Sequence, residues 1–104
     1  MTQKTTLVGQ ATPEQIEEWK KKYGKLWAII VGGHICYIRK PTRNELSYSA
    51  TVSQNNPLRG NEVLLKAAWV GGSESIQTED ELFFGASAKL AEIITVKEAE
   101  LVNL

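Results

Sequence analysis

The residues best suited to chemistry in this sequence are His34 and Cys36, its one histidine and its one cysteine. Residues two positions apart on a β-strand point to the same face, so an imidazole and a thiolate would stand side by side. A zinc site needs three or four ligands, and no other His or Cys is present to complete one. A Cys36 nucleophile would need His34 as its base, and same-face neighbours on a strand seldom bring those atoms within hydrogen-bond distance. We therefore expect no catalytic, metal-binding or cofactor-binding residue.

Two glycine pairs, Gly32-Gly33 and Gly71-Gly72, are candidates for a phosphate-binding loop, because glycine-rich loops can bind phosphate groups through their backbone. Neither pair lies in a G-x-x-x-x-G-K-[ST] or a G-x-G-x-x-G motif. A hairpin turn explains the first pair and the end of a helix explains the second.

Basic side chains form two clusters, one around Pro41 (residues 39–43) and one at residues 20–25. Trp19, Trp27 and Tyr37 lie close by in sequence, and basic groups interleaved with aromatic rings can bind single-stranded nucleic acid. The whole chain nevertheless carries 12 basic and 12 acidic residues in 104, and this zero net charge disfavours nucleic acid. A small nucleic-acid-binding module that uses the cluster from Arg39 to Arg43 remains the alternative hypothesis.

The zero net charge hides an uneven distribution. Residues 1–66 carry ten basic and five acidic groups, a net charge of +5, whereas residues 67–104 carry two basic and seven acidic groups, a net charge of −5. The acidic run at residues 79–81 suits the first turn of a helix, where negative charge complements the helix dipole. Glu98 and Glu100 have no such role, so they could face the basic part of the same chain or of a neighbouring copy. This favours a homo-oligomer as one outcome.

Local patterns predict the first three elements. Thr12 and Pro13 begin a helix at Pro13–Tyr23, which ends at Gly24. Two β-branched and aromatic runs, Leu26–Val31 and His34–Arg39, flank the first glycine pair and predict a hairpin in which Val31 lies opposite His34. Both faces of this hairpin are largely apolar, so helices must cover it or its edge must pair with another chain.

Three further helices complete the prediction. Thr42 with Glu45 begins one at residues 43–53, Asn56 caps one that runs from 57 to 69 or 70, and Thr78 with Glu81 begins the last, whose apolar stripe extends to Leu101. The third is apolar nearly all round, which indicates a central buried helix, and Gly60 inside it suits a close helix crossing. A break or kink is plausible at residues 93–96. The sequence therefore predicts an α+β protein, α-β-β-α-α-α, with a flexible segment at residues 1–11 and a single domain at 12–104.

The hydropathy pattern bears on the compartment. No apolar run approaches the ~18–20 residues of a membrane span, and the first residues lack the apolar core of a secretory signal. A lone cysteine cannot form an intramolecular disulfide. These features predict a cytoplasmic protein that does not enter membranes.

Six short motifs, in order, carry a resemblance to a known group of proteins. They are YIRKPTR at residues 37–43, PL and NE at 57–58 and 61–62, WVGG at 69–72, DELF at 80–83 and VKEAEL at 96–101. Over residues 13–102 the sequence resembles the small tail-assembly chaperones and tail accessory proteins encoded by phages and prophages, particularly of Bacteroides-type bacteria. No motif of that group has a known chemical role, so no functional residue carries over.

The resemblance implies a non-enzymatic role in tail morphogenesis in the cytoplasm of a bacterial host. A tail-assembly chaperone binds the long, apolar, helical tape-measure protein, which requires an exposed apolar surface and several copies along a filament. The protein partner would be tape-measure-like or another tail protein. The candidate partner-binding residues are the aromatic and basic side chains Trp19, Trp27, Tyr37, Arg39, Arg43 and Trp69. For each tryptophan, a place in the core is an equally good explanation.

Overall fold

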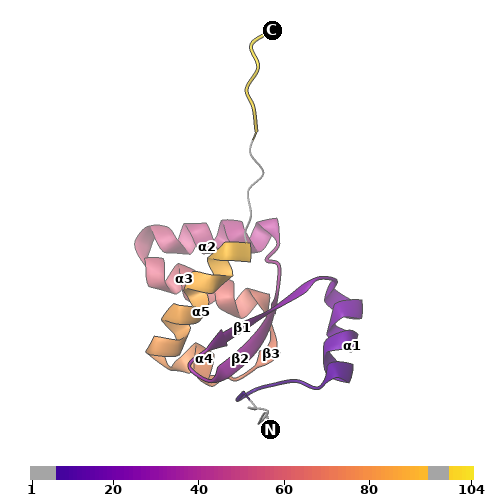
Figure 1. Cartoon of the computed structure of the whole chain (residues 1–104). Helices are drawn as coiled ribbons and strands as arrows, with labels where there is room; N and C mark the ends of the chain where they lie inside the picture. Colours follow the sequence, from indigo (N-terminus) through magenta and orange to yellow (C-terminus); the bar gives the residue numbers. More distant parts are fainter. Residues whose placement is uncertain (1–6, 94–98) are drawn as a thin grey trace.

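The part of the chain that the structure describes forms a small α+β domain with a three-stranded sheet and five helices (Figure 1). Its structure, a computed structural model, describes residues 7–93 and 99–104. The elements in chain order are α1 (Pro13–Tyr23), β1 (Leu26–Val31), β2 (His34–Arg39), α2 (Arg43–Asn55), α3 (Pro57–Ala68), β3 (Trp69–Gly72), α4 (Ser75–Thr78) and α5 (Asp80–Ile93). The predicted fold class is confirmed, with one strand and one short helix more than expected.

The hairpin of β1 and β2 has the predicted register. Val31 lies opposite His34 and Trp27 opposite Ile38 in an antiparallel pair. The turn works because Gly32 and Gly33 have φ of +53° and +78°, a region that costs side-chain-bearing residues energy. Since side chains alternate along a strand, Trp27 and Ile29 share one face of β1, while Ala28 and Ile30 share the other.

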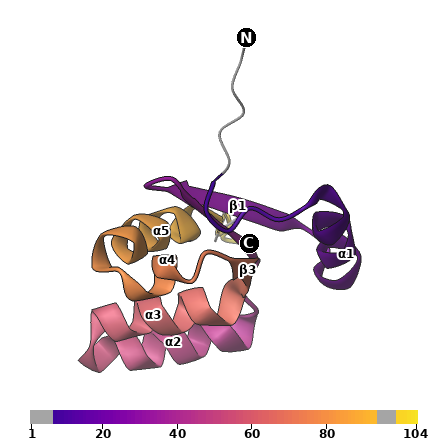
Figure 2. The same cartoon turned by 90° about the horizontal axis from the view of Figure 1, so that it is seen from below.

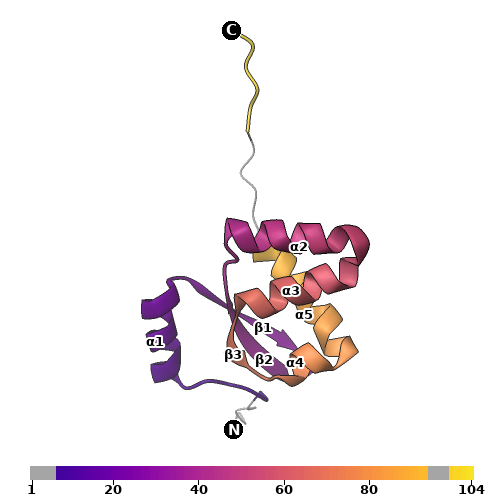
Figure 3. The ribbon, with the colours of Figure 1, turned by 180° about the vertical axis from the view of Figure 1, so that it is seen from behind.

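The segment Trp69–Gly72 is the main correction to the predicted secondary structure. The expected third helix ends at Ala68, and the next four residues form β3, antiparallel to β2 with Tyr37 opposite Gly71. The strand order is β1-β2-β3, and Figure 3 shows β3 beside β2. The second glycine pair therefore belongs to a strand and not to a helix end. A Cβ at Gly71 would come within 2.8 Å of the Trp19 ring, so glycine permits α1 to pack closely on this strand.

The helix starts follow the predicted capping residues. The Thr12 hydroxyl accepts a hydrogen bond from the Gln15 amide, and Asn56 accepts one from the Arg59 amide. Thr42 and Glu45 form the complete reciprocal capping box at the start of α2. These caps supply acceptors for amides that have no partner within the helix.

Helices α2 and α3 cross closely at Gly60, as predicted. Gly60 is buried, its carbonyl accepts a 2.8 Å hydrogen bond from the Ser49 hydroxyl, and an added Cβ would lie 2.8 Å from the Cβ of Ser53. The expectation that α3 is buried all round is wrong, because Leu58 is 55% exposed and only Gly60, Leu65 and Ala68 are buried. Helix α3 packs on α2 with one side and supplies the core with the other.

The predicted last helix is divided and shorter than expected. Thr78 ends the short α4, and α5 begins at Asp80 and ends at Ile93. Leu101, expected in its apolar stripe, lies outside the helix and is fully exposed. Most of the expected kink region, residues 94–96, lies outside the described residues.

The sheet separates two unequal layers (Figure 2). On one face, Ile29, Cys36 and Ile38 form the core with residues of α3, α4 and α5, namely Leu65, Ala68, Ile76, Phe83, Ala86 and Leu90. On the other face, Ile35 and Tyr37 are covered by α1 and the preceding residues 7–12. Val8 exchanges backbone hydrogen bonds with Gly33 and Ile35, which attaches part of the expected flexible segment to β2.

None of the helices within residues 7–93 and 99–104 is long and apolar enough to cross a membrane.

Candidate interaction site

A shallow apolar depression runs along the outer edge of β1. It is lined by residues of β1 and of the C-terminal half of α5, namely Trp27, Ala28, Ile29, Ile30, Lys89, Glu92 and Ile93, and has a volume of about 340 Å³. We call it the β1–α5 groove. An adjoining cavity of about 410 Å³ shares Trp27, Glu92 and Ile93 with it and adds Tyr23, Lys25 and Lys40. The two form a continuous hollow beside the strand.

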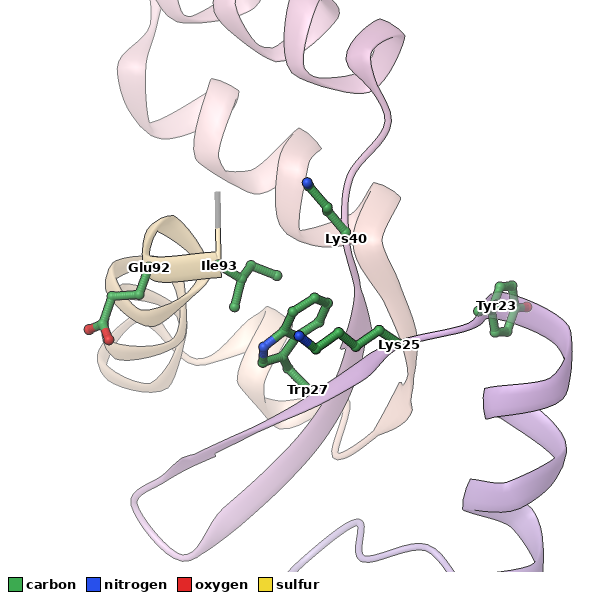
Figure 4. Close-up of a pocket in the computed structure, with 6 residues that line it drawn as sticks. All are labelled: Tyr23, Lys25, Trp27, Lys40, Glu92 and Ile93. Atoms are coloured by element: carbon green, nitrogen blue, oxygen red, sulfur yellow. The ribbon is translucent and has the colours of Figure 1, made fainter. Parts of the chain in front are cut away.

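Trp27 lies at the centre of this hollow (Figure 4). Its indole packs against the core beside Ile93, and the ammonium of Lys25 lies 5.3 Å from the centre of a Trp27 ring. At that distance a lysine is attracted to the face of the ring. The hollow thus has an aromatic floor with a cation held over it.

Among the residues that the structure describes, the charged side chains on the rim are mostly basic. Lys25, Lys40 and Lys89 line it together with one carboxylate, that of Glu92. Lys89 and Glu92 form an ion pair of 3.0 Å, and both side chains are about two-thirds exposed. Such an exposed pair is weak and readily exchanged. The charges on the rim therefore favour a binding partner with acidic residues.

The wall of the groove that faces solvent is apolar. Ile30 is 61% exposed, whereas its neighbour Ile29 is buried in the core. Ala28 is also exposed. In residues 7–93 and 99–104, no strand pairs with the outer edge of β1, so its outward backbone groups are open to another strand.

Two of the residues predicted to bind a partner lie instead between α1 and the sheet. The rings of Trp19 and Tyr37 are 5.3 Å apart, and Trp19 also packs on Gly71. Tyr37 is 5% exposed, and its hydroxyl accepts a hydrogen bond from the Ala11 amide at 3.1 Å. Both rings hold α1 and the N-terminal residues on the sheet.

Arg39 is engaged within the fold. It donates two hydrogen bonds to Glu45, of 2.7 and 2.9 Å, and one of 2.7 Å to the carbonyl of Ala67. The hydrogen bonds with Glu45 raise the pKa of Arg39, and the same bonds lower the pKa of Glu45 from 4.5 to about 2. The guanidinium joins the end of β2 to α2 and to the end of α3.

The remaining predicted residues are separated. Arg43 is exposed as the first residue of α2, and Trp69 lies at the start of β3, partly buried against the core. The structure thus brings only Trp27, of the six candidates, into the β1–α5 groove. Sequence reasoning missed Ile30 and Ile93, because nothing local marks which side of a strand stays uncovered.

His34 makes a contact that the sequence did not indicate. Its Nδ1 lies 2.8 Å from the hydroxyl of Ser73, 39 residues away. Ser73 is 5% exposed, and the contact joins β2 to the connection between β3 and α4. Cys36 is fully buried, and burial raises the pKa of its thiol to about 11, which keeps it protonated. Within the described residues, no three His, Cys, Asp or Glu side chains are arranged to hold a metal ion.

Comparison with known proteins adds information on the fold. No protein-family profile matches the chain, and no curated protein matches its sequence. The structure is similar to that of the "uncharacterised protein rbstp2171 from Bacillus stearothermophilus", with a TM-score of 0.63 and 21% sequence identity over 85% of this chain and 99% of that chain. At this identity the likeness shows a shared fold only.

Proposed function

We propose that this protein acts without catalysis and binds an apolar helical segment of a protein partner in the β1–α5 groove. The partner is tape-measure-like, as the resemblance to phage and prophage tail-assembly chaperones implies, and the site of action is the cytoplasm of a bacterial host. The observation that carries the proposal is the exposed apolar wall of Ala28 and Ile30 beside Trp27.

The chemistry of the groove suits an amphipathic helix. Trp27, Ile29 and Ile93 on the α5 side of β1, together with Ala28 and Ile30 at its outer edge, give the groove an apolar lining, which suits the apolar stripe that such a helix presents. Lys25, Lys40 and Lys89 on the rim would pair with acidic residues that flank the stripe. Ile30 is 61% exposed, so covering it contributes about 1–2 kcal/mol, which changes an affinity roughly five- to thirtyfold.

Co-expression with a fragment of a tape-measure protein tests the proposal. The soluble fraction of the fragment should rise in the presence of the wild-type protein and should fall back with the variant Ile30→Glu. Leu58→Glu is the matched control, because Leu58 is 55% exposed but lines a different hollow, beside Phe84. A fragment that aggregates equally with and without the wild-type protein would exclude the chaperone role.

The alternative function, nucleic-acid binding through residues 39–43, has less support. Its central side chain, Arg39, is already bonded to Glu45 and to Ala67, so it would have to give up those partners to hold a phosphate. A gel-shift assay at low salt separates the two functions. Retardation of single-stranded DNA or RNA at micromolar protein, abolished by Lys40→Glu with Arg43→Glu, would favour the alternative.

A further inference from the structure

The C-terminal residues 99–104 present apolar side chains to solvent. Leu101 and Leu104 are fully exposed and Val102 is 67% exposed. Figure 1 shows this segment leading away from the domain, and it belongs to no helix or strand of the described chain. Three large apolar residues among six, without cover, are a surface that another protein surface would bury.

The open edge of β1 is a matching surface. Both faces of β1 are apolar, with Trp27 and Ile29 on one side and Ala28 and Ile30 on the other. An extended segment that pairs with such an edge gains backbone hydrogen bonds from the strand and side-chain contacts on both faces. In an extended segment, Leu101 points to one face while Val102 and Leu104 point to the other, so each face of β1 meets an apolar residue.

The apolar residues of the segment are close enough together to lie along this strand. Leu101, Val102 and Leu104 fall within four consecutive residues, which span roughly 13 Å when extended. β1 contains six residues, so all three side chains can lie along its open edge.

Charge supports the same pairing. Glu98 and Glu100 belong to the acidic part of the sequence, and Lys25, Lys40 and Lys89 surround the groove. The ion pairs found among the described residues are Arg39–Glu45, Lys66–Glu62 and Lys89–Glu92, and each joins groups from the same part of the charge distribution. The opposite charges of the segment and of the groove would favour a contact between them.

We propose that residues 99–104 of one copy add as a strand to the outer edge of β1 in a second copy, and so occupy the β1–α5 groove. The inference rests on the proposed function in one respect, that this groove is a docking site. It adds a self-association step in which copies cover each other's grooves until a partner displaces the segment. Reciprocal exchange gives a closed dimer, and one-way exchange gives a chain of copies.

The mass in solution, measured by light scattering after size exclusion at low salt, tests the proposal. The mass of the wild-type protein should rise from that of one chain, 11.6 kDa, toward that of two or more chains as its concentration increases. The variant Leu101→Glu with Leu104→Glu should remain a monomer at concentrations where the wild type associates, and its fold is not at risk because both side chains are fully exposed. Leu58→Glu should associate as the wild type does. A wild-type protein that stays monomeric at all concentrations overturns the proposal, as does association that survives the double substitution.

A mixing experiment shows whether the segment and the groove belong to different copies. The variant Ile30→Glu has an intact C-terminal segment and a disrupted β1–α5 groove. The double variant Leu101→Glu with Leu104→Glu has an intact groove and a disrupted segment. Each alone should be monomeric, and an equimolar mixture should form a two-chain complex. Monomers in the mixture overturn the proposal.

The two proposals fail in different ways. Monomeric wild-type protein that still solubilises the tape-measure fragment rejects segment exchange and leaves the proposed function standing. Association that depends on Leu101 and Leu104, without any effect on the fragment, rejects the proposed function and keeps segment exchange.

Discussion

Replacing Glu45 with glutamine isolates the contact between Arg39 and Glu45. The two side chains form a two-pronged pair, from Nη1 to Oε1 at 2.9 Å and from Nη2 to Oε2 at 2.7 Å, and they are 23% and 26% exposed. Glu45 also accepts a hydrogen bond from the Thr42 amide at 2.8 Å. A glutamine oxygen can keep that capping bond, so the substitution removes the ion pair and spares the cap.

The size of the effect follows from the pKa of Glu45. Hydrogen bonds from Arg39 lower this pKa from 4.5 to about 2, while burial acts in the opposite direction. At about 1.4 kcal/mol per pH unit this sets an upper limit of about 3 kcal/mol. About a quarter of each side chain is exposed, so water and salt screen the pair. We expect Glu45→Gln to lower the free energy of unfolding by about 2 kcal/mol at pH 7.

The same contact predicts a pH dependence. Because the pKa of Glu45 is lower in the folded state, its stabilisation is complete above pH 4.5 and is lost as the pH falls toward 2. The stability difference between wild type and Glu45→Gln should therefore shrink across that window. Urea unfolding followed by tryptophan fluorescence at several pH values measures it.

Glu62→Gln is the matched control for this experiment. Glu62 pairs with Lys66 at 3.2 Å, but both side chains are more exposed, at 39% and 56%. We expect this change to cost no more than about 0.5 kcal/mol. Equal costs for the two substitutions, or a difference for Glu45→Gln that persists to pH 2, would refute the reasoning.

Two further substitutions and one thiol reagent test the packing of the fold. Gly60→Ala should lower the free energy of unfolding, measured in urea, by about 1–3 kcal/mol, because the added Cβ would meet Ser53. This loss is expected although alanine is the better helix former. Unchanged stability would argue against the close crossing of α2 and α3. Cys36 should react with a thiol reagent at pH 8 at least about 100-fold more slowly in the folded than in the urea-unfolded protein. The reason is that its thiol is buried, with a pKa of about 11. Fast modification of the native protein would contradict this burial. Ser73→Ala should cost about 1 kcal/mol in thermal unfolding through the lost contact with His34, and an unchanged midpoint would show that the bond contributes nothing.

Local chemistry made most of the fold predictable. The glycine pair at the first turn requires positive φ at both positions, and this requirement alone sets the register of β1 and β2. Thr42 and Asn56 mark helix starts because their side chains accept hydrogen bonds from amides within the same turn. Such signals lie within four residues of the feature that they specify.

The features that the sequence did not reveal depend on distant partners. β3 is four residues long, and only the free side of β2, more than 30 residues earlier, makes it a strand. A tryptophan and a valine that continue an apolar helix give no local indication of that pairing. The contact of His34 with Ser73 is hidden for the same reason.

The candidate site follows from where β3 pairs. By taking the free side of β2, β3 leaves β1 as the open edge of the sheet. Helix α1 covers only part of the hairpin, because Trp19 packs on Tyr37 and Gly71, at the β3 side. Ile30, one strand away, remains 61% exposed. The sequence predicts that a hairpin apolar on both faces needs cover or a strand partner. Among the described residues, the edge of β1 that no strand pairs with is the edge beside the lysines of the β1–α5 groove.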